Sequence, residues 1–217
     1  MTALILAALL GHGPAEFQAA FPAATLSRAP SGERLTGASG FEAGGLGRTP
    51  VRTARAFLAR YGGAFGVSPR QELRLLSATP AGRPGAVRFE RRVGGLPVFG
   101  GDVVVGVDGH AAVVLVNTAD VPPRASGRWR LARKAAVAAA AAELPGKAAG
   151  RARTARGWRA LGDTLRPVWR VDLATRAPTG EWRSDVDAET GKVLFRADLR
   201  VDARPPPGPP RGGPLLR

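Results

Sequence analysis

Cysteine is absent from this 217-residue chain, and histidine occurs only twice, as His12 and His110. Without cysteine the chain can form no disulfide, thiol nucleophile, iron–sulfur cluster or cysteine-ligated zinc site. Two histidines are too few for a three-histidine metal site, and the chain holds no His-Glu-x-x-His pair. We therefore predict no catalytic residues, no metal ligands and no cofactor.

Long apolar runs are also missing, since none approaches the ~18 residues that a membrane-spanning helix needs. The short run from Ala3 to Leu10 has the length of a signal-peptide core, and small residues follow it where cleavage would occur. No Lys or Arg precedes that run, so a short apolar N-terminal segment is the alternative. We predict a leader (a candidate signal peptide) and a loop over 1–48, and a secreted or periplasmic protein.

Acidic residues are scarce, at 17 against 32 Lys and Arg, which leaves a formal charge of +15. Residues 122–170 hold 12 of the basic residues and 2 of the acidic ones, and we expect a basic loop over 146–163. The interleaved side chains that would suit a nucleic-acid groove are Arg128, Trp129, Arg130, Arg151, Arg153, Arg156, Trp158 and Arg159. Attraction to acidic surfaces is a second interpretation, and the codon bias of a GC-rich gene is a third.

Residues 49–121 show a helical period followed by a strand period. Thr49-Pro50 is a typical helix start. Apolar residues then recur at spacings of three and four, as on one face of a helix: Val51, Ala54, Leu58, Tyr61 and Phe65. From Ala86 the period is two, with Val87 and Phe89 on one face, a strand over 98–107, a hairpin turn at Asp108-Gly109, and a return strand over 113–116.

Residues 122–200 repeat the order of helix and then strands. Alanine content predicts a helix over 132–144, which Pro145-Gly146 ends. Strands are predicted over 169–173, 182–188 and 193–195, and the Pro-rich tail over 201–217 is predicted to be disordered. The fold class is α+β, in two small modules that each pack a helix on an antiparallel sheet.

Two stretches resemble known families. The segment VRFERRVGGLPVFGGDVVVGVDGHAAVVLVN over 87–117 resembles the fungalysin/thermolysin propeptide motif, and AFLARYGGAFGV over 56–67 looks like the helix of that module. The segment EWRSDVDAETGKVLF over 181–195 looks like the end of a PepSY domain, which has a cystatin-like fold. A first module over 49–121 and a PepSY-like module over 122–200 are together similar to the prosegment of secreted thermolysin-like zinc metallopeptidases.

This resemblance implies a non-catalytic protein that inhibits a zinc metallopeptidase or helps it fold. The catalytic domain would be its partner, in cis or in trans, and the chain could be the truncated front of such a peptidase. A secreted binding module without a peptidase partner is the alternative, and nucleic-acid binding ranks third. Glu90-Arg91 replaces the polar pair usual after Arg-Phe. The motif positions, structural or partner-facing, are Arg88, Phe89, Gly95, Pro97, Val98, Gly100, Gly101, Trp182, Asp187 and Gly191.

Overall fold

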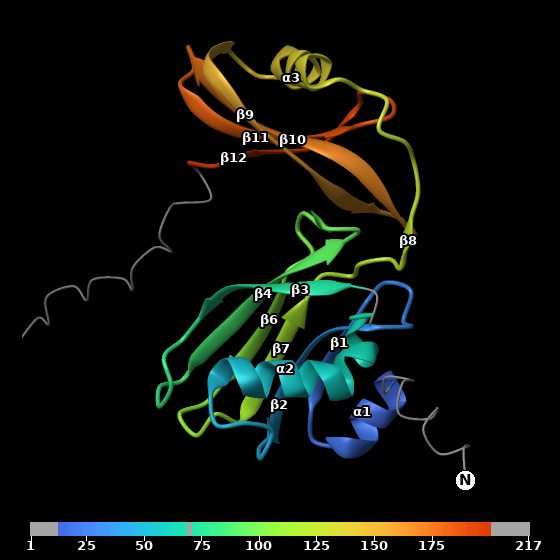
Figure 1. Ribbon diagram of the computed structural model, residues 1–217, viewed down its shortest axis with the longest axis vertical. Helices are drawn as coiled ribbons and strands as arrows, with labels where there is room; N and C mark the ends of the chain where they lie inside the picture. The colour runs from blue at the N-terminus through green and yellow to red at the C-terminus, as the bar shows by residue number, and fades with distance from the viewer. Residues whose placement is uncertain (1–12, 69–70, 201–217) are drawn as a thin grey trace, which may run out of the picture. The chain divides into compact units, whose positions relative to one another are not determined.

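The computed structural model describes residues 13–68 and 71–200. It confirms the α+β class, because helices pack on sheets whose strands are mainly antiparallel (Figure 1). The chain forms two compact units: unit 1 comprises 1–129 with 156–168, and unit 2 comprises 130–155 with 169–217. The predicted signal-peptide core, His12 and the predicted disordered tail lie outside the described residues.

Unit 1 is built on a seven-stranded sheet in the order β1-β2-β7-β6-β4-β3, with β5 paired to β4. Its helices are α1 (Pro14–Ala20), α2 (Pro50–Tyr61) and the 3-10 helix η2 (Gly62–Phe65). Its strands are β1 (Thr25–Arg28), β2 (Leu35–Ala43), β3 (Glu72–Ala78), β4 (Gly85–Val93), β5 (Leu96–Pro97), β6 (Val103–Val107) and β7 (Val113–Thr118). The predicted helix start is confirmed, since the Thr49 hydroxyl accepts the Arg52 amide at 3.4 Å.

The prediction of a loop after the leader was wrong, because this segment supplies α1, β1 and β2. Strand β2 pairs with β1 on one side and with β7 on the other. It buries Leu35, Ala38 and Phe41, but its glycines and small residues hide the alternation in the sequence. Its pairing with β7 is also irregular between Ser39 and Ala43. Tertiary pairing therefore decides this strand, while local propensity does not.

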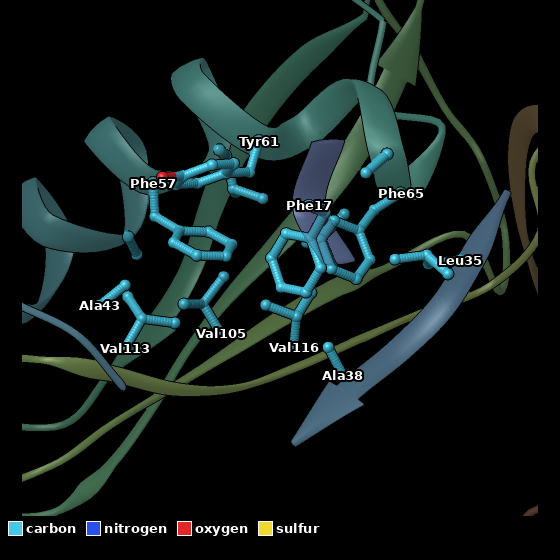
Figure 2. Packing of buried hydrophobic residues seen from close by; sticks show 14 of the residues in the cluster. Phe17, Leu35, Ala38, Ala43, Phe57, Tyr61, Phe65, Val105, Val113 and Val116 are labelled. Carbon is cyan, nitrogen blue, oxygen red and sulfur yellow. The ribbon is translucent and has the colours of Figure 1, made fainter. Parts of the chain in front are cut away.

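The core of unit 1 is an aromatic cluster between the helices and the sheet (Figure 2). Phe17 of α1 lies at its centre and is fully buried. Its ring centroid is 5.0 to 6.2 Å from those of Phe21, Phe41, Phe57, Tyr61 and Phe65. The predicted apolar stripe is confirmed for the most part, because Ala54, Leu58 and Tyr61 of α2 and Phe65 of η2 are buried and Val51 is partly buried.

The predicted strand meander is confirmed in kind and corrected at two turns. Val87 and Phe89 are fully buried, as are alternate valines of β6. Strand β6 begins at Val103, five residues later than predicted, because the chain turns at Gly100, whose φ is +76°. The next turn has its left-handed residue at Ala111 instead of Gly109, and the Asp108 carboxylate accepts the amides of His110 and Ala112.

Two long strands run through both units of the chain: β9 (Lys147–Leu161) and β10 (Thr164–Arg176). Within unit 1, β8 (Arg124–Ala125) pairs in parallel with the start of β10. Val98, Val121 and Leu165 form a small second core there. The predicted basic loop over 146–163 was therefore wrong, since 147–161 is a 15-residue strand. Its Arg, Ala and Gly residues give no apolar alternation that would have indicated one.

Unit 2 packs α3 (Arg133–Ala142) on a sheet in which β10 pairs with β9 and with β11 (Gly180–Asp187), and β11 pairs with β12 (Val193–Asp198). The predicted Ala-rich helix is confirmed, and it buries only Ala136 and Ala140. The predicted apolar face of β10 is also confirmed, with Trp169, Val171 and Leu173 buried.

Candidate functional site

Three of the predicted motif positions are part of the packing of unit 1. Phe89 is fully buried beneath α2, with the Arg55 guanidinium 5.2 Å from its ring centroid. Val98 is buried in the small second core, and its amide donates to the Arg91 carbonyl at 2.8 Å. A Cβ at Gly101 would lie 2.7 Å from Val98 Cγ1, so only glycine fits there. A substitution at any of these positions would destabilise the fold and would therefore not report on binding alone.

The turn between β4 and β6 accounts for three more motif positions. Gly95 and Gly100 have φ values of +74° and +76°, which only glycine adopts without strain. Pro97 lies in the two-residue strand β5, where it pairs with Arg92. The Gly95 carbonyl accepts the Arg92 Nε–H at 3.1 Å, which ties the turn back to β4. These residues shape the turn.

Arg88 differs from these positions because its side chain faces solvent. It lies on β4, on the face of the strand opposite Phe89, and its side chain is 56% exposed. Its Nε–H donates to Asp102 Oδ2 at 2.8 Å. Strand register places Arg88 opposite Val104, and Leu115 of β7 lies on the same face. Leu115 is 40% exposed, so this face presents both charge and apolar surface.

Arg91 is a fully buried cation, and its burial was not predicted from the sequence. It follows Val87 and Phe89 in the alternation of β4, which puts its side chain on the core side. Its guanidinium donates to the carbonyl oxygens of Phe65 and Gly66, at 3.2 Å each, and to the Thr118 hydroxyl. The cation therefore satisfies carbonyls at the end of η2, where a positive charge is also favoured by the helix dipole.

Two charged residues of opposite sign, Arg34 and Asp120, act on Arg91. Arg34 lies near it, with Nη2 2.9 Å from Asp120 Oδ1. Desolvation, reinforced by the charge of Arg34 and opposed by that of Asp120, lowers the pKa of Arg91 to about 10. The Nε–H groups of Arg91 and Arg34 are buried and have no hydrogen-bond acceptor among the described residues. Burial of this cation therefore costs folding free energy that its three oxygen acceptors offset.

The remaining motif positions lie in unit 2, and all three are explained by local structure. Trp182 of β11 is partly buried, and its indole N–H donates to the Thr175 hydroxyl at 3.2 Å. The buried Asp187 carboxylate accepts the amides of Glu189 and Thr190, at 2.8 and 2.9 Å. Gly191 closes the same turn with a φ of +79°. This arrangement is an Asx-type turn that connects β11 to β12.

Asp185 and Asp187 alternate along β11, a pattern typical of a solvated strand face, yet both are buried. Asp185 accepts two hydrogen bonds from the Arg170 guanidinium, at 2.8 and 2.9 Å. A second pair of the same kind joins Arg183 to Asp172, at 2.8 Å for both bonds, and raises the pKa of Arg183. The two bidentate pairs link β10 to β11.

Trp129 and Trp158, the two tryptophans of the pattern predicted to suit nucleic acid, make contacts inside unit 1. The Trp158 indole N–H donates to the Val93 carbonyl at 2.9 Å, and its ring packs against the small second core. The Trp129 ring centroid lies 6.3 Å from that of Trp158, and the Arg156 guanidinium lies 5.2 Å from the Trp129 centroid. Because both rings make these contacts, they are poorly placed to stack on nucleic-acid bases.

The part of the chain that the structure describes holds no group of three residues able to bind a metal ion. His110 lies exposed in the turn between β6 and β7. Among the same residues, no helix combines the length and the apolar character that crossing a membrane requires.

Comparison with known proteins supports one part of the predicted resemblance. The Fungalysin/Thermolysin Propeptide Motif matches residues 85–119, which run from β4 through β7 and include every predicted motif position of unit 1. No curated protein matches the chain in sequence. Among solved structures, the chain is similar to the Bacillus megaterium YpeB C-terminal domain, with 10% identity and a TM-score of 0.41 over 81% of this chain and 76% of that one. The resemblance of residues 122–200 to a PepSY domain stays a prediction.

Proposed function

We propose that this chain is a non-catalytic, propeptide-like protein that binds a secreted zinc metallopeptidase and inhibits it, helps it to fold, or does both. The observation that carries the proposal is the propeptide motif over 85–119. The resemblance of residues 181–195 to a PepSY domain supports it, because the two modules would follow one another as in a metallopeptidase prosegment. Secretion or export to the periplasm is part of the proposal.

A folding role has a physical basis in unit 1. A large β-rich catalytic domain folds slowly, since its strand pairing must close long loops. Unit 1 has its own aromatic core and a sheet that its own residues complete. Such a unit can present a preformed surface to the slower-folding catalytic domain. Unit 1 is already ordered, so binding costs it little further conformational entropy.

The surface that we assign to the peptidase is the outward face of β4, β6 and β7. Helix α2 contacts these strands from the opposite face, as their buried residues require (Figure 1). The outward face combines the exposed Arg88–Asp102 ion pair with the half-exposed Leu115. A polar contact beside an apolar anchor is a common composition for a protein–protein interface. Arg88 is thus the motif position of unit 1 that we expect to contact the partner.

The test measures inhibition and refolding yield of a thermolysin-type zinc peptidase in the presence of the purified chain. We expect inhibition, and Arg88→Ser should weaken it by about tenfold, corresponding to one lost interfacial contact of ~1.4 kcal/mol. Arg52→Ser on α2 is the matched control, because Arg52 is also exposed but lies outside this face. Absence of both binding and refolding assistance, across peptidases from the same source, would refute the proposal.

A binding module without a peptidase partner is the second candidate. The specific observation in its favour is the basic strand β9, in which residues 147–161 include Lys147, Arg151, Arg153, Arg156 and Arg159 and no acidic residue. Binding of a non-peptidase partner that is unaffected by Arg88→Ser would favour this candidate.

A further inference from the structure

The part of β9 that belongs to unit 2 carries positive charges that the fold does not neutralise. Lys147, Arg151 and Arg153 are exposed and have no ion pair or hydrogen bond from their side chains among the described residues. Four arginines elsewhere in the sheets have an acidic partner: Arg74 pairs with Glu90, Arg88 with Asp102, Arg170 with Asp185, and Arg183 with Asp172. Lys147, Arg151 and Arg153 therefore present uncompensated positive charge along one stretch of a strand.

The backbone of this part of β9 has one side available for pairing. Strand β9 pairs with β10, and its one bridge outside the named strands joins Trp158 to Val98, beyond residues 147–155. Within the described residues, the other edge of 147–155 therefore presents unpaired amide and carbonyl groups. An extended peptide can add to such an edge and form main-chain hydrogen bonds.

The charges are spaced to select such a peptide. Arg151 and Arg153 are two residues apart, so their side chains lie on the same face of the strand, ~7 Å apart. Residues directly opposite in an added strand would have Cβ atoms about 5 Å from theirs. An added strand with acidic residues at alternate positions would therefore place a carboxylate against each guanidinium. A second copy of β9 would place like charges together, which disfavours pairing between copies of this chain.

We propose that residues 147–155 of β9 bind an extended acidic segment of a partner protein by strand addition. The proposal does not depend on a metallopeptidase partner. It is favoured over nucleic acid because strand addition uses the free backbone edge, and because Trp129 and Trp158 are engaged within unit 1. The exposed residues of this stretch provide charge and no large apolar side chain, so a lipid surface would be held by electrostatics alone.

The experiment uses the full chain and fluorescein-labelled peptides of about nine residues, the length needed to cover this edge. The first peptide alternates Glu with Thr or Val, the second has the same composition with its Glu residues in one block, and the third has a central Pro. We expect the alternating peptide to bind most tightly in fluorescence anisotropy. Each of the other two should bind about tenfold more weakly. The block peptide cannot place a Glu opposite each arginine, and the peptide with Pro lacks one backbone N–H donor.

Two double variants distinguish binding by β9 from binding by the overall positive charge of the chain. Arg151→Glu with Arg153→Glu should abolish binding of the alternating peptide, whereas Arg52→Glu with Arg60→Glu on α2 should leave it within about twofold. Circular dichroism must show that both variants are folded. Equal binding of all three peptides would overturn the proposal, because charge alone would then explain the affinity.

Two further probes, single-stranded DNA and phosphatidylserine vesicles, test competing classes of partner. Single-stranded DNA or phosphatidylserine vesicles that bind more tightly than the alternating peptide, and lose that binding in the β9 variant, would replace the proposal with a polyanion site. Absence of binding to every probe would leave β9 as a charged edge that only prevents self-association, and would also overturn it. None of these outcomes bears on inhibition of a peptidase, which is measured separately through Arg88.

Discussion

The two units of this chain achieve their folds with different chemistry. Unit 1 buries the aromatic cluster around Phe17, and large rings of this kind remove 150–250 Å² each from water. Unit 2 packs a helix that buries only two alanines, Ala136 and Ala140, and links β10 to β11 by two bidentate Arg–Asp pairs. Since apolar area dominates folding free energy, unit 1 should be the more stable unit.

The largest expected effect is the loss of Phe17. Phe17→Ala would leave a cavity among five neighbouring rings and should lower the free energy of unfolding by about 3–5 kcal/mol. Ala140→Gly on α3 should cost about 1 kcal/mol in unit 2. Amide hydrogen exchange in β4 and β11, measured for both variants, separates the units. Equal protection loss from the two substitutions would contradict the comparison.

The next effect concerns the buried ion pair of unit 2. Asp185 is fully buried and Arg170 is 19% exposed, so Asp185→Ala would leave a largely desolvated guanidinium without its carboxylate. Breaking such a pair from one side costs about 3 kcal/mol. Urea denaturation followed by tryptophan fluorescence measures this cost. A loss below about 1 kcal/mol would show that solvent reaches the pair.

Arg91 gives an intermediate effect in unit 1. Arg91→Gln keeps a donor toward the carbonyls at the end of η2 but cannot reach all three acceptors, so we expect a loss of about 1–2 kcal/mol. Arg91→Ala removes every donor and should cost more. If the glutamine variant were less stable than the alanine variant, the hydrogen bonds would not be what retains a cation at this position.

The pH dependence of Arg91 has a defined sign. Its pKa is lowered to about 10 in the folded state, so the folded protein releases this proton at lower pH than the unfolded chain does. The cost of burying the charge is fully present below that pH. At a pH above about 10, Arg91 is deprotonated in the folded protein and takes up a proton on unfolding. The free energy of unfolding of the parent protein, relative to that of Arg91→Gln, should therefore rise as pH increases from about 9 to 11. A constant difference across this range would contradict the assignment.

The smallest effect should come from the more exposed pair. Asp172 and Arg183 match Asp185 and Arg170 in chemistry and in bidentate geometry, but their side chains are 27% and 34% exposed. Asp172→Ala should therefore cost under about 1 kcal/mol, and less still at high salt. The double-mutant cycle with Arg183→Ala measures the coupling. A cost equal to that of Asp185→Ala would mean that burial does not separate the two pairs.

Much of the local structure could be predicted from the sequence because its patterns are strong. The helix that starts at Thr49 has a capping residue, a proline and an apolar stripe, and β4 and β6 alternate clearly. In contrast, β2 and β9 consist largely of small or charged residues and carry no period. Such segments become strands only because neighbouring strands accept their hydrogen bonds. That is why both were predicted as loops.

The candidate site shows the same division. The sequence identified the motif from Arg88 to Gly101, and the structure separated the exposed Arg88 from positions whose side chains or backbone conformation build the fold. The alternation of Val87, Phe89 and Arg91 was visible in the sequence, yet a charged residue is not normally assigned to a core. The carbonyls that accept Arg91 come from a helix some 25 residues away, at positions that no local pattern reveals.

By itself, the sequence determined the class of fold, the propeptide motif and the absence of cysteine chemistry, because each depends on residue identity and short-range spacing. Only the tertiary structure decided that Phe17 centres a core, that Arg91 is buried, and that Lys147, Arg151 and Arg153 stay exposed on a strand edge. The physical reason is that burial and pairing depend on which distant segments meet. A charge can be neutralised, desolvated or left for a partner with no change in its immediate neighbours along the chain.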